Sequence, residues 1–425
     1  MQAFKLLRLI YKRLKDKGSG LMGLNKTIVG VVFGGESVEH DVSILTGLQF
    51  IEGLDHVKYD ALPIYISENG KWWTGGALLK RGFYPLNETK EQSLTQIGLA
   101  LGKSQNRPAL DVWEKGFLGK TKDPIPVDII VPAVHGTMGE DGAMQGLLEA
   151  ANIPYTGCGI MASSTTINKD FTKTILDKAG LNILPHVLIT RPNEGEYLFE
   201  DDIKTCIEEE MKGVSFPFIV KPRQLGSSVG VAKAYNLEDL MAGLIAAFRL
   251  DSAALIEPFV PNLVEYNVAV TKAFGALRVS AIERPKTEAD VLDFSEKYLA
   301  GSDGGPKLDQ SPSEGMLSLS RDINPKDLSG KDANFIRKSA SLAFKLLDLL
   351  GCVRVDFLGN AKTKEYWLNE INTIPGSFAY FLWTDADSPA TYQDLSSALI
   401  EEGFRTFKDR QRETSASGGN SKIFT

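Results

Sequence analysis

The 425-residue sequence contains little cysteine and histidine, and it has no excess of basic residues. Its three cysteines, Cys158, Cys206 and Cys352, are widely spaced without a CxxC pair. This argues against a disulfide framework or a cysteine zinc site, and it fits a reducing, cytoplasmic compartment. The spacing of the four histidines, His40, His56, His135 and His186, likewise indicates no metal cluster. A net charge of −7 lacks the basic footprint of nucleic-acid-binding proteins, which favours small-molecule chemistry.

The length predicts two or three domains, and 43% hydrophobic with 24% charged residues is ordinary globular composition. Residues 1–20 carry six basic side chains and one acidic one, with apolar residues at helical spacing. They permit a short basic helix on a lipid surface or a partner, but are too short to span a membrane. The alternative is a frayed extension before a domain that begins near Lys26, with Met22 as the natural start. The Ser/Gly-rich end of the chain predicts a disordered tail.

The first half of the chain alternates strand and helix patterns. An apolar run over 27–33 ends in Gly34 and Gly35, and a helix is predicted over 43–51. Further strands are expected over 59–66 and 127–132, which predicts a small parallel sheet. A glycine-rich loop over 134–142 precedes a predicted helix over 143–151. Such glycines let the backbone approach a ligand, although loops of this kind are also common without function.

The middle of the chain combines lysines with a Gly/Ser loop. A helix is predicted over 161–179 and carries Lys169, and a strand over 216–222 ends near Lys221. Residues 223–231 form a loop whose N–H groups and hydroxyls can surround phosphate oxygens, the alternative being a flexible hairpin. It is not a P-loop, because the G-x4-G-K-[ST] order is absent. The strand end at 255–261, with Glu265 beyond it, offers carboxylates and backbone to adenine and ribose.

Two strands near the end of the chain bring acidic residues together. Residues 351–357 and 366–376 read as a hairpin that places Asp356 opposite Glu370. Because alternate side chains share a face, Arg354 lies with Asp356, and Asn372 lies with Glu370. Three hard oxygen ligands and a guanidinium suit Mg²⁺ and phosphoryl or acyl transfer. The alternative is a solvated hairpin with acids placed by chance.

Two features precede this hairpin. The Gly/Pro/Ser-rich stretch 300–321 is long for a loop, which predicts a lid over a site. An amphipathic helix is expected over 334–350.

Together these residues resemble the ATP-grasp enzymes, and closely the D-alanine–D-alanine ligase family, from Lys26 to about Phe407. Order and spacing agree at several motifs, which are Gly34-Gly-Glu-Ser-Val-Glu39-His-Asp-Val-Ser43, His135-Gly-Thr-Met-Gly-Glu-Asp-Gly142, Gln145-Gly-Leu-Leu-Glu149, Ile153-Pro-Tyr-Thr-Gly157, Lys221-Pro222, Gly226-Ser-Ser-Val-Gly230, Lys297-Tyr298, Arg354-Val-Asp356 and Asn369-Glu-Ile-Asn-Thr-Ile-Pro-Gly376.

The resemblance implies an α/β ATP-grasp fold of three domains, with an N-terminal parallel-sheet domain and ATP held between two antiparallel sheets. The expected division is a basic extension (1–25), an N-terminal domain (26–159), a central domain (160–260), a C-terminal domain (261–410) with a lid loop (299–322), and a tail (411–425). The expected protein is a cytoplasmic, homodimeric ligase that joins two D-alanines for peptidoglycan.

The resemblance also implies roles for individual residues. Phosphates would contact Lys169, Lys221 and Lys297 together with Gly226 and Ser228, while adenine and ribose would contact Glu257, Val260 and Glu265. Two Mg²⁺ ions, or Mn²⁺, would bind Asp356, Glu370 and Asn372. The first amino acid would be oriented by Glu39, Ser227 and Tyr298. Arg354 and the Gly376 N–H would stabilise the oxyanion of the tetrahedral intermediate.

Several positions depart from the family pattern. The usual Met-Asp-Lys is Ile167-Asn168-Lys169, the Glu-Lys pair at the adenine hinge is Glu257-Pro258, and a serine expected to bind the acceptor carboxylate is Phe381. Ser377 is the predicted replacement donor, the alternative being backbone N–H groups in a shifted loop. These changes leave open another acceptor, such as D-lactate, D-serine or another amino acid, although Tyr298 favours an amine. A third hypothesis, a catalytically silent nucleotide-binding protein, is disfavoured by the intact acids and Arg354.

Overall fold

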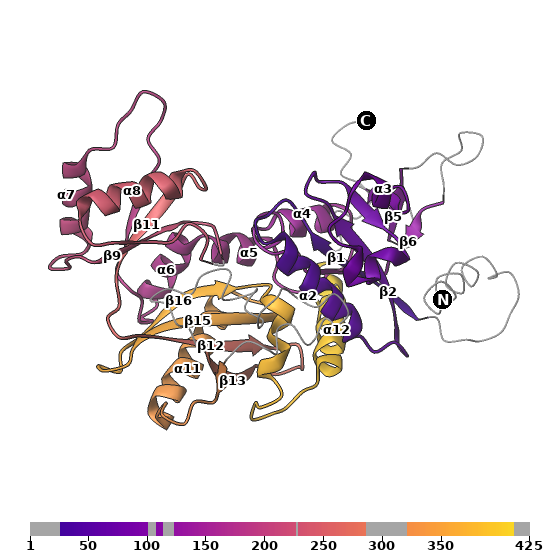
Figure 1. The fold of residues 1–425 in the computed structure, drawn as a ribbon. Helices are drawn as coiled ribbons and strands as arrows, with labels where there is room; N and C mark the ends of the chain where they lie inside the picture. Colours follow the sequence, from indigo (N-terminus) through magenta and orange to yellow (C-terminus); the bar gives the residue numbers. More distant parts are fainter. Residues whose placement is uncertain (1–25, 101–107, 114–122, 227, 286–320, 412–425) are drawn as a thin grey trace, which may run out of the picture.

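The computed structural model describes residues 26–100, 108–113, 123–226, 228–285 and 321–411. Several predicted features lie outside these residues: the basic extension, the tail beyond residue 411, most of the lid loop, and the site residues Ser227, Lys297 and Tyr298. The described chain forms three sheets in sequence order (Figure 1). No helix within the described ranges is long and apolar enough to cross a membrane.

The first sheet has seven strands in the order β6-β5-β4-β3-β2-β1-β7. Its strands are β1 (Thr27–Gly34), β2 (Tyr59–Ile66), β3 (Trp72–Thr74), β4 (Thr95–Leu99), β5 (Ala109–Val112), β6 (Ile125–Pro126) and β7 (Ile129–Pro132). Strand β1 is parallel to β2 and β7, as predicted, but the remaining pairs are antiparallel. The sheet is therefore mixed, because β2 to β6 follow one another without the long crossover helices that parallel strands need.

Short and long helices accompany this sheet. They are α2 (His40–Glu52), η1 (Gly76–Leu79), η2 (Arg81–Phe83), α3 (Glu88–Glu91) and α4 (Ala143–Ala150). The single helix predicted over 161–179 is wrong, since α5 (Ile160–Ile167) ends before α6 (Lys169–Lys178) begins. Between them Asn168 has an extended backbone, and its side-chain oxygen accepts a hydrogen bond from the Phe171 N–H at 3.2 Å. Asn168 thus caps α6 and starts it at Lys169.

The second and third sheets are antiparallel. The second has the order β10-β9-β11-β8, with β8 (Val187–Thr190), β9 (Phe218–Pro222), β10 (Ala232–Ala234) and β11 (Ala253–Pro258), accompanied by α7 (Glu200–Glu210) and α8 (Leu237–Phe248). The third has the order β14-β13-β12-β15-β16, with β12 (Leu263–Thr271), β13 (Arg278–Pro285), β14 (Arg321–Ile323), β15 (Cys352–Asn360) and β16 (Tyr366–Asn372), accompanied by α11 (Gly330–Leu346). The chain then continues through η4 (Gly376–Leu382) to α12 (Tyr392–Arg410).

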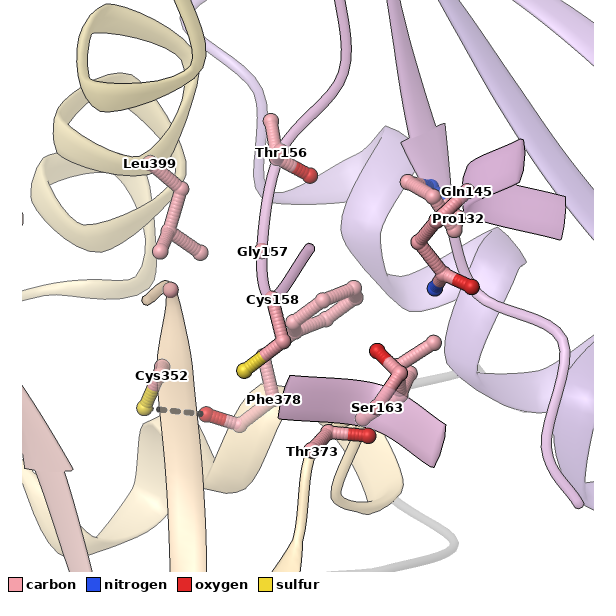
Figure 2. A pocket seen from close by; sticks show the side chains of 12 residues that line it. Pro132, Gln145, Thr156, Gly157, Cys158, Ser163, Cys352, Thr373, Phe378 and Leu399 are labelled. Atoms are coloured by element: carbon pink, nitrogen blue, oxygen red, sulfur yellow. Dashed lines mark hydrogen bonds between the residues drawn. The ribbon is translucent and has the colours of Figure 1, made fainter. Parts of the chain in front are cut away.

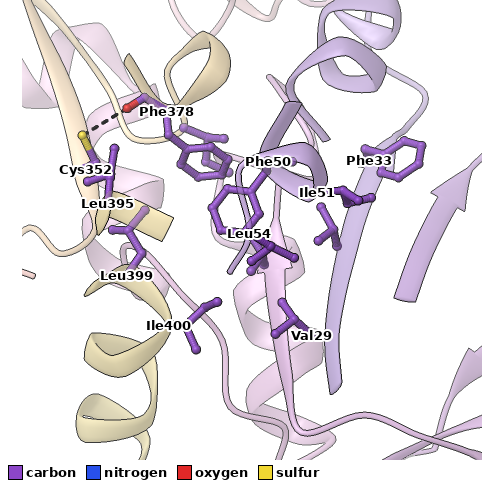
Figure 3. Packing of buried hydrophobic residues seen from close by; sticks show 14 of the residues in the cluster. Val29, Phe33, Phe50, Ile51, Leu54, Cys352, Phe378, Leu395, Leu399 and Ile400 are labelled. Atoms are coloured by element: carbon purple, nitrogen blue, oxygen red, sulfur yellow. Dashed lines mark hydrogen bonds between the residues drawn. The ribbon is translucent and has the colours of Figure 1, made fainter. Parts of the chain in front are cut away.

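One hydrophobic core joins the first sheet to the C-terminal part of the chain. Phe33 of β1 and Phe50 of α2 belong to the same buried cluster as Phe378 of η4 and Leu399 of α12 (Figure 3). The rings of Phe50 and Phe378 have centroids 4.9 Å apart. Burying a side chain of this size contributes about 1.5–3 kcal/mol, so this packing fixes η4 against α2.

Candidate active site

A cleft lies between the second and third sheets and has about 860 Å³ of space, including its open mouth. This falls within the roughly 300–1,000 Å³ of typical ligand pockets. Eight of the predicted site residues line it: Lys169, Lys221, Ser228, Glu257, Val260, Glu265, Asp356 and Glu370. Residues far apart in the sequence are therefore gathered in one cleft.

The third sheet contains the predicted hairpin and its acidic residues. Strands β15 and β16 pair Asp356 with Glu370 and Arg354 with Asn372. Arg354 donates to both carboxylate oxygens of Asp356, through Nε at 2.7 Å and Nη2 at 2.8 Å. The Asn372 amide donates to Asp356 Oδ2 at 3.0 Å. Four polar groups therefore converge at one end of the cleft.

This polar row continues beyond the residues that sequence reasoning found. Asn267 of β12 pairs with Asp356 on one side and with Glu283 of β13 on the other. The Asn267 amide donates to Glu283 Oε2 at 3.2 Å. Both side chains are buried. Polar residues at alternate positions in otherwise apolar strands were the signal that could have identified them.

Opposite the acids, buried lysines surround Glu257. Lys221 Nζ lies 2.7 Å from Glu257 Oε2, and Lys173 Nζ lies 2.9 Å from Oε1. Burial alone would raise the pKa of Glu257, but the two lysines outweigh it and lower this pKa to about 2. Burial lowers the pKa of Lys173 to about 8. Sequence reasoning missed Lys173, although its position four residues after Lys169 places both on one face of α6.

The lysines of the cleft form ion pairs with two different carboxylates. The Glu257 carboxylate, predicted to contact adenine or ribose, is held between two ammonium groups. Lys221 also donates to Asn369 Oδ1 at 3.0 Å. Lys169 donates to the Leu225 carbonyl, and its ammonium lies 3.8 Å from Glu370 Oε2. Lys169 therefore connects the Gly/Ser loop to the acidic hairpin.

A smaller pocket adjoins the cleft and reaches the first sheet. Its lining includes Glu39, Gly226 and Asn372 together with Lys169 and Glu370, which also line the larger cleft. The pocket has about 380 Å³ of space. Glu39, which is predicted to orient an amino acid, therefore lines the same pocket as Lys169 and Glu370.

Glu140 lies at the wall of this smaller pocket, and sequence reasoning gave it no role. It accepts hydrogen bonds from the N–H groups of Gly136 at 3.0 Å and Ile374 at 2.9 Å. Burial, followed by the nearby charge of Glu39, raises the pKa of Glu140 to about 7. Glu140 therefore joins the glycine-rich loop to the segment after β16.

Gly376 and Ser377 lie at the start of η4 and line neither pocket. Ser377 is fully buried, and its hydroxyl donates to Gln49 Oε1 of α2. These contacts give no support to an acceptor-binding role for Ser377.

Near the other end of η4, the Arg321 guanidinium lies 4.1 Å from the Phe381 ring centroid, and its Nη1 is 3.1 Å from Glu283 Oε1.

A separate small cavity lies between the first and third sheets and is lined by Gln145, Ser163 and Phe378, among others (Figure 2). The thiols of Cys158 and Cys352 lie here and donate to the carbonyls of Leu350 and Phe378, each at 3.2 Å. Burial raises the pKa of both thiols to about 12, so they are unreactive. None of the cleft lysines or hairpin acids lines this cavity, which is distinct from the candidate site.

Two antiparallel sheets that enclose a cleft with lysines on one side and paired acids on the other define the ATP-grasp class. Family models described as the D-ala D-ala ligase N-terminus and C-terminus match residues 28–158 and 175–401. The chain therefore belongs to the D-alanine–D-alanine ligase family, as the sequence motifs predicted.

Individual relatives agree with this assignment. The chain is 33% identical to a D-alanine–D-alanine ligase of Thermosipho africanus over 383 residues, which cover 90% of this chain and 95% of the relative. It is 34% identical to the enzyme of that name from Ruminiclostridium cellulolyticum, covering 92% and 98%. The solved structure of the Coxiella burnetii D-alanine–D-alanine ligase has a TM-score of 0.71 at 25% identity, covering 91% of this chain and 96% of that one.

Proposed function

We propose that the protein is an ATP-dependent ligase that joins two D-alanine molecules to supply a peptidoglycan precursor. The observation that carries this proposal is the pairing of Asp356 with Glu370, beside Arg354, in a cleft that also contains Lys169 and Lys221. Relatives named D-alanine–D-alanine ligase match 90% or more of the chain, which supports the same activity.

The lysine side of the cleft would bind the phosphates of ATP. Lys169 and Lys221 carry positive charge, and the N–H groups around Gly226 and Ser228 can bind phosphate oxygens. Because the Glu257 carboxylate already pairs with two lysines, recognition of the adenine falls to the backbone from Glu257 to Val260. Glu265 would then bind the ribose hydroxyls.

The acidic side of the cleft fits magnesium. Among the residues that the structure describes, no group of three His, Cys, Asp or Glu side chains could hold a metal. Two carboxylates and a carboxamide are nevertheless hard oxygen donors of the kind that binds Mg²⁺ together with substrate phosphates. Asp356, Glu370 and Asn372 would hold two Mg²⁺ or Mn²⁺ ions, which would neutralise charge on the transferred phosphoryl group.

The reaction proceeds in two steps. The carboxylate of the first D-alanine attacks the γ-phosphorus of ATP, so that an O–P bond forms and the bond to ADP breaks. The amine of the second D-alanine then attacks the acyl carbon and loses a proton to solvent, while the C–O bond to phosphate breaks. Glu39, with the predicted Ser227 and Tyr298, would orient the first amino acid. Arg354 and the Gly376 N–H would stabilise the oxyanion of the tetrahedral intermediate.

Discrimination between acceptors tests the substrate part of this proposal. Purified protein would receive ATP, Mg²⁺ and D-alanine together with equal D-lactate and D-serine at neutral pH, and the products would be separated by mass. We expect D-alanyl-D-alanine to predominate. Predominant ester or mixed dipeptide would assign another acceptor, which the replacement of the family serine by Phe381 would then explain.

Three further properties belong to the proposal. The three free cysteines, two of them buried, are consistent with cytoplasmic action. Assembly as a homodimer and weak lipid contact by residues 1–20 stay predictions. Light scattering of the purified protein tests the dimer. Flotation with anionic vesicles, compared between the full chain and one starting at Met22, tests the lipid contact.

A further inference from the structure

Three consecutive residues after the acidic hairpin adopt a left-handed backbone. Ser377, Phe378 and Ala379 have φ of 52°, 53° and 50° and ψ of 27°, 27° and 29°. None of them is glycine, and this conformation is disfavoured for residues with a Cβ atom. Strained backbone of this kind persists only where surrounding contacts fix it, and it concentrates at functional sites.

Helix α2 of the first sheet supplies the polar contacts that fix this segment. The Ser377 N–H donates to Thr46 Oγ1 at 3.2 Å, and the Ser377 hydroxyl donates to Gln49 Oε1. Thr46 and Gln49 are three residues apart on α2, so both lie on one face of the helix. Each is only 1% exposed. A buried polar pair on a helix must be hydrogen-bonded to be tolerated. Both side chains contact the strained segment, and Thr46 Oγ1 also lies 2.8 Å from His135 Nε2.

Other groups fix the residues on either side. The Ile374 N–H donates to Glu140, and the Phe378 N–H donates to the Pro375 carbonyl at 2.7 Å. The side chain of Phe378 packs against Phe50 of α2. The amides around Gly376 are therefore held in place from both sides.

The Gly376 N–H itself differs from its neighbours. No hydrogen bond joins it to any residue that the structure describes, although Gly376 is buried. A buried donor without a protein partner is rare and indicates a ligand or water partner. One backbone N–H of this segment, four positions after Asn372 at the end of β16, is therefore left without a partner among the described residues.

We propose that Thr46 and Gln49 are positioning residues, which hold the left-handed segment 377–379 and thereby fix the Gly376 N–H for the reaction. The inference rests on the proposed function, because the oxyanion is formed in the ligase reaction. Helix α2 packs on the first sheet and contributes no residue to the nucleotide cleft. The proposal gives this helix a direct effect on the chemical step.

The test uses Thr46→Val and Gln49→Leu, with Thr46→Ser as the conservative variant and Thr74→Val as the matched control. Thr74 is also buried in the first sheet, and its hydroxyl donates to a single carbonyl, that of Pro63 at 2.7 Å. Phosphate release with ATP and D-alanine gives kcat and the KM for ATP. Hydrogen exchange of the peptide covering 374–380 reports the segment directly, and thermal unfolding reports the folded fraction.

We expect Thr46→Val and Gln49→Leu to lower kcat roughly tenfold to a hundredfold, as small misplacements of reacting groups do, while the KM for ATP stays unchanged. Exchange in 374–380 should become faster. Thr46→Ser should keep the wild-type kcat and the wild-type exchange rate of 374–380. Thr74→Val should change only the unfolding temperature.

Unchanged exchange in 374–380 for both variants would overturn the proposal, as would wild-type kcat despite faster exchange. If Gln49→Leu does not fold, the Thr46→Val and Thr46→Ser pair decides. If the wild type releases no phosphate with any D-amino acid, the proposed function fails. In that case the exchange measurement still decides whether α2 holds the segment.

Discussion

The buried charges around Glu257 allow a quantitative test of the cleft. The carboxylate is 2% exposed and lies between Lys173, which is fully buried, and Lys221. Glu257→Gln would leave two ammonium groups without the carboxylate that neutralises part of their charge. Breaking a buried ion pair in this way costs about 3–5 kcal/mol. Lys173→Met should cost less, about 1.5–3 kcal/mol, because Glu257 keeps its contact with Lys221.

The double variant tests the charge balance among these three side chains. In the wild type, two lysines and one glutamate give these three side chains a net charge of +1, and Glu257→Gln with Lys173→Met retains that charge on Lys221 alone. The loss of stability in the double variant should therefore be smaller than the sum of the single losses, by about 1–3 kcal/mol. Hydrogen exchange of β9 and β11 amides measures the opening free energy of this sheet. Additive losses, or a loss below about 1 kcal/mol for Glu257→Gln, would show that Glu257 does not stabilise the two lysines.

Three other changes test separate parts of the structure. Glu370→Gln should nearly abolish phosphate release and leave the fold intact, because it removes a metal ligand, whereas Glu365→Gln on the exposed part of the same hairpin should retain activity. Ala379→Gly should raise stability by up to about 1 kcal/mol, since glycine accepts the left-handed backbone, and Ala242→Gly within α8 should lower it by a similar amount in the same denaturation assay. Since burial raises the pKa of Glu140 to about 7, its proton is bound more tightly in the folded state. Its contribution to stability should then be complete below about pH 4.3 and decline as the pH rises to 7; Glu140→Gln, compared by unfolding at each pH, should lack that decline.

The acidic hairpin could be predicted because its information is local. Strand alternation and a single reversing turn are enough to place Asp356 opposite Glu370, and the register of β15 and β16 confirms this pairing. The strand that ends near Lys221 was found in the same way. Both predictions depend on a few neighbouring residues whose side-chain period is fixed by the backbone.

The contacts that were missed are between residues far apart in the chain. Gln49 and Ser377 are separated by 328 positions, and no local pattern shows that the Ser377 hydroxyl contacts helix α2. Lys173 reads as one more charged position on α6 until the second sheet places Glu257 beside it. The break at Asn168 was missed because the apolar spacing continues across it, whereas the cap depends on one side-chain hydrogen bond.

If the cleft uses ATP to join two D-alanines, the stoichiometry of the products will show it. The protein would be incubated with ATP, Mg²⁺ and D-alanine as the sole amino acid, and ADP, phosphate and dipeptide would be measured over the same time course. We expect one ADP and one phosphate for each D-alanyl-D-alanine formed, with none of the three appearing when D-alanine is omitted. ATP consumption without dipeptide, or dipeptide formation only with a different acceptor, would contradict it.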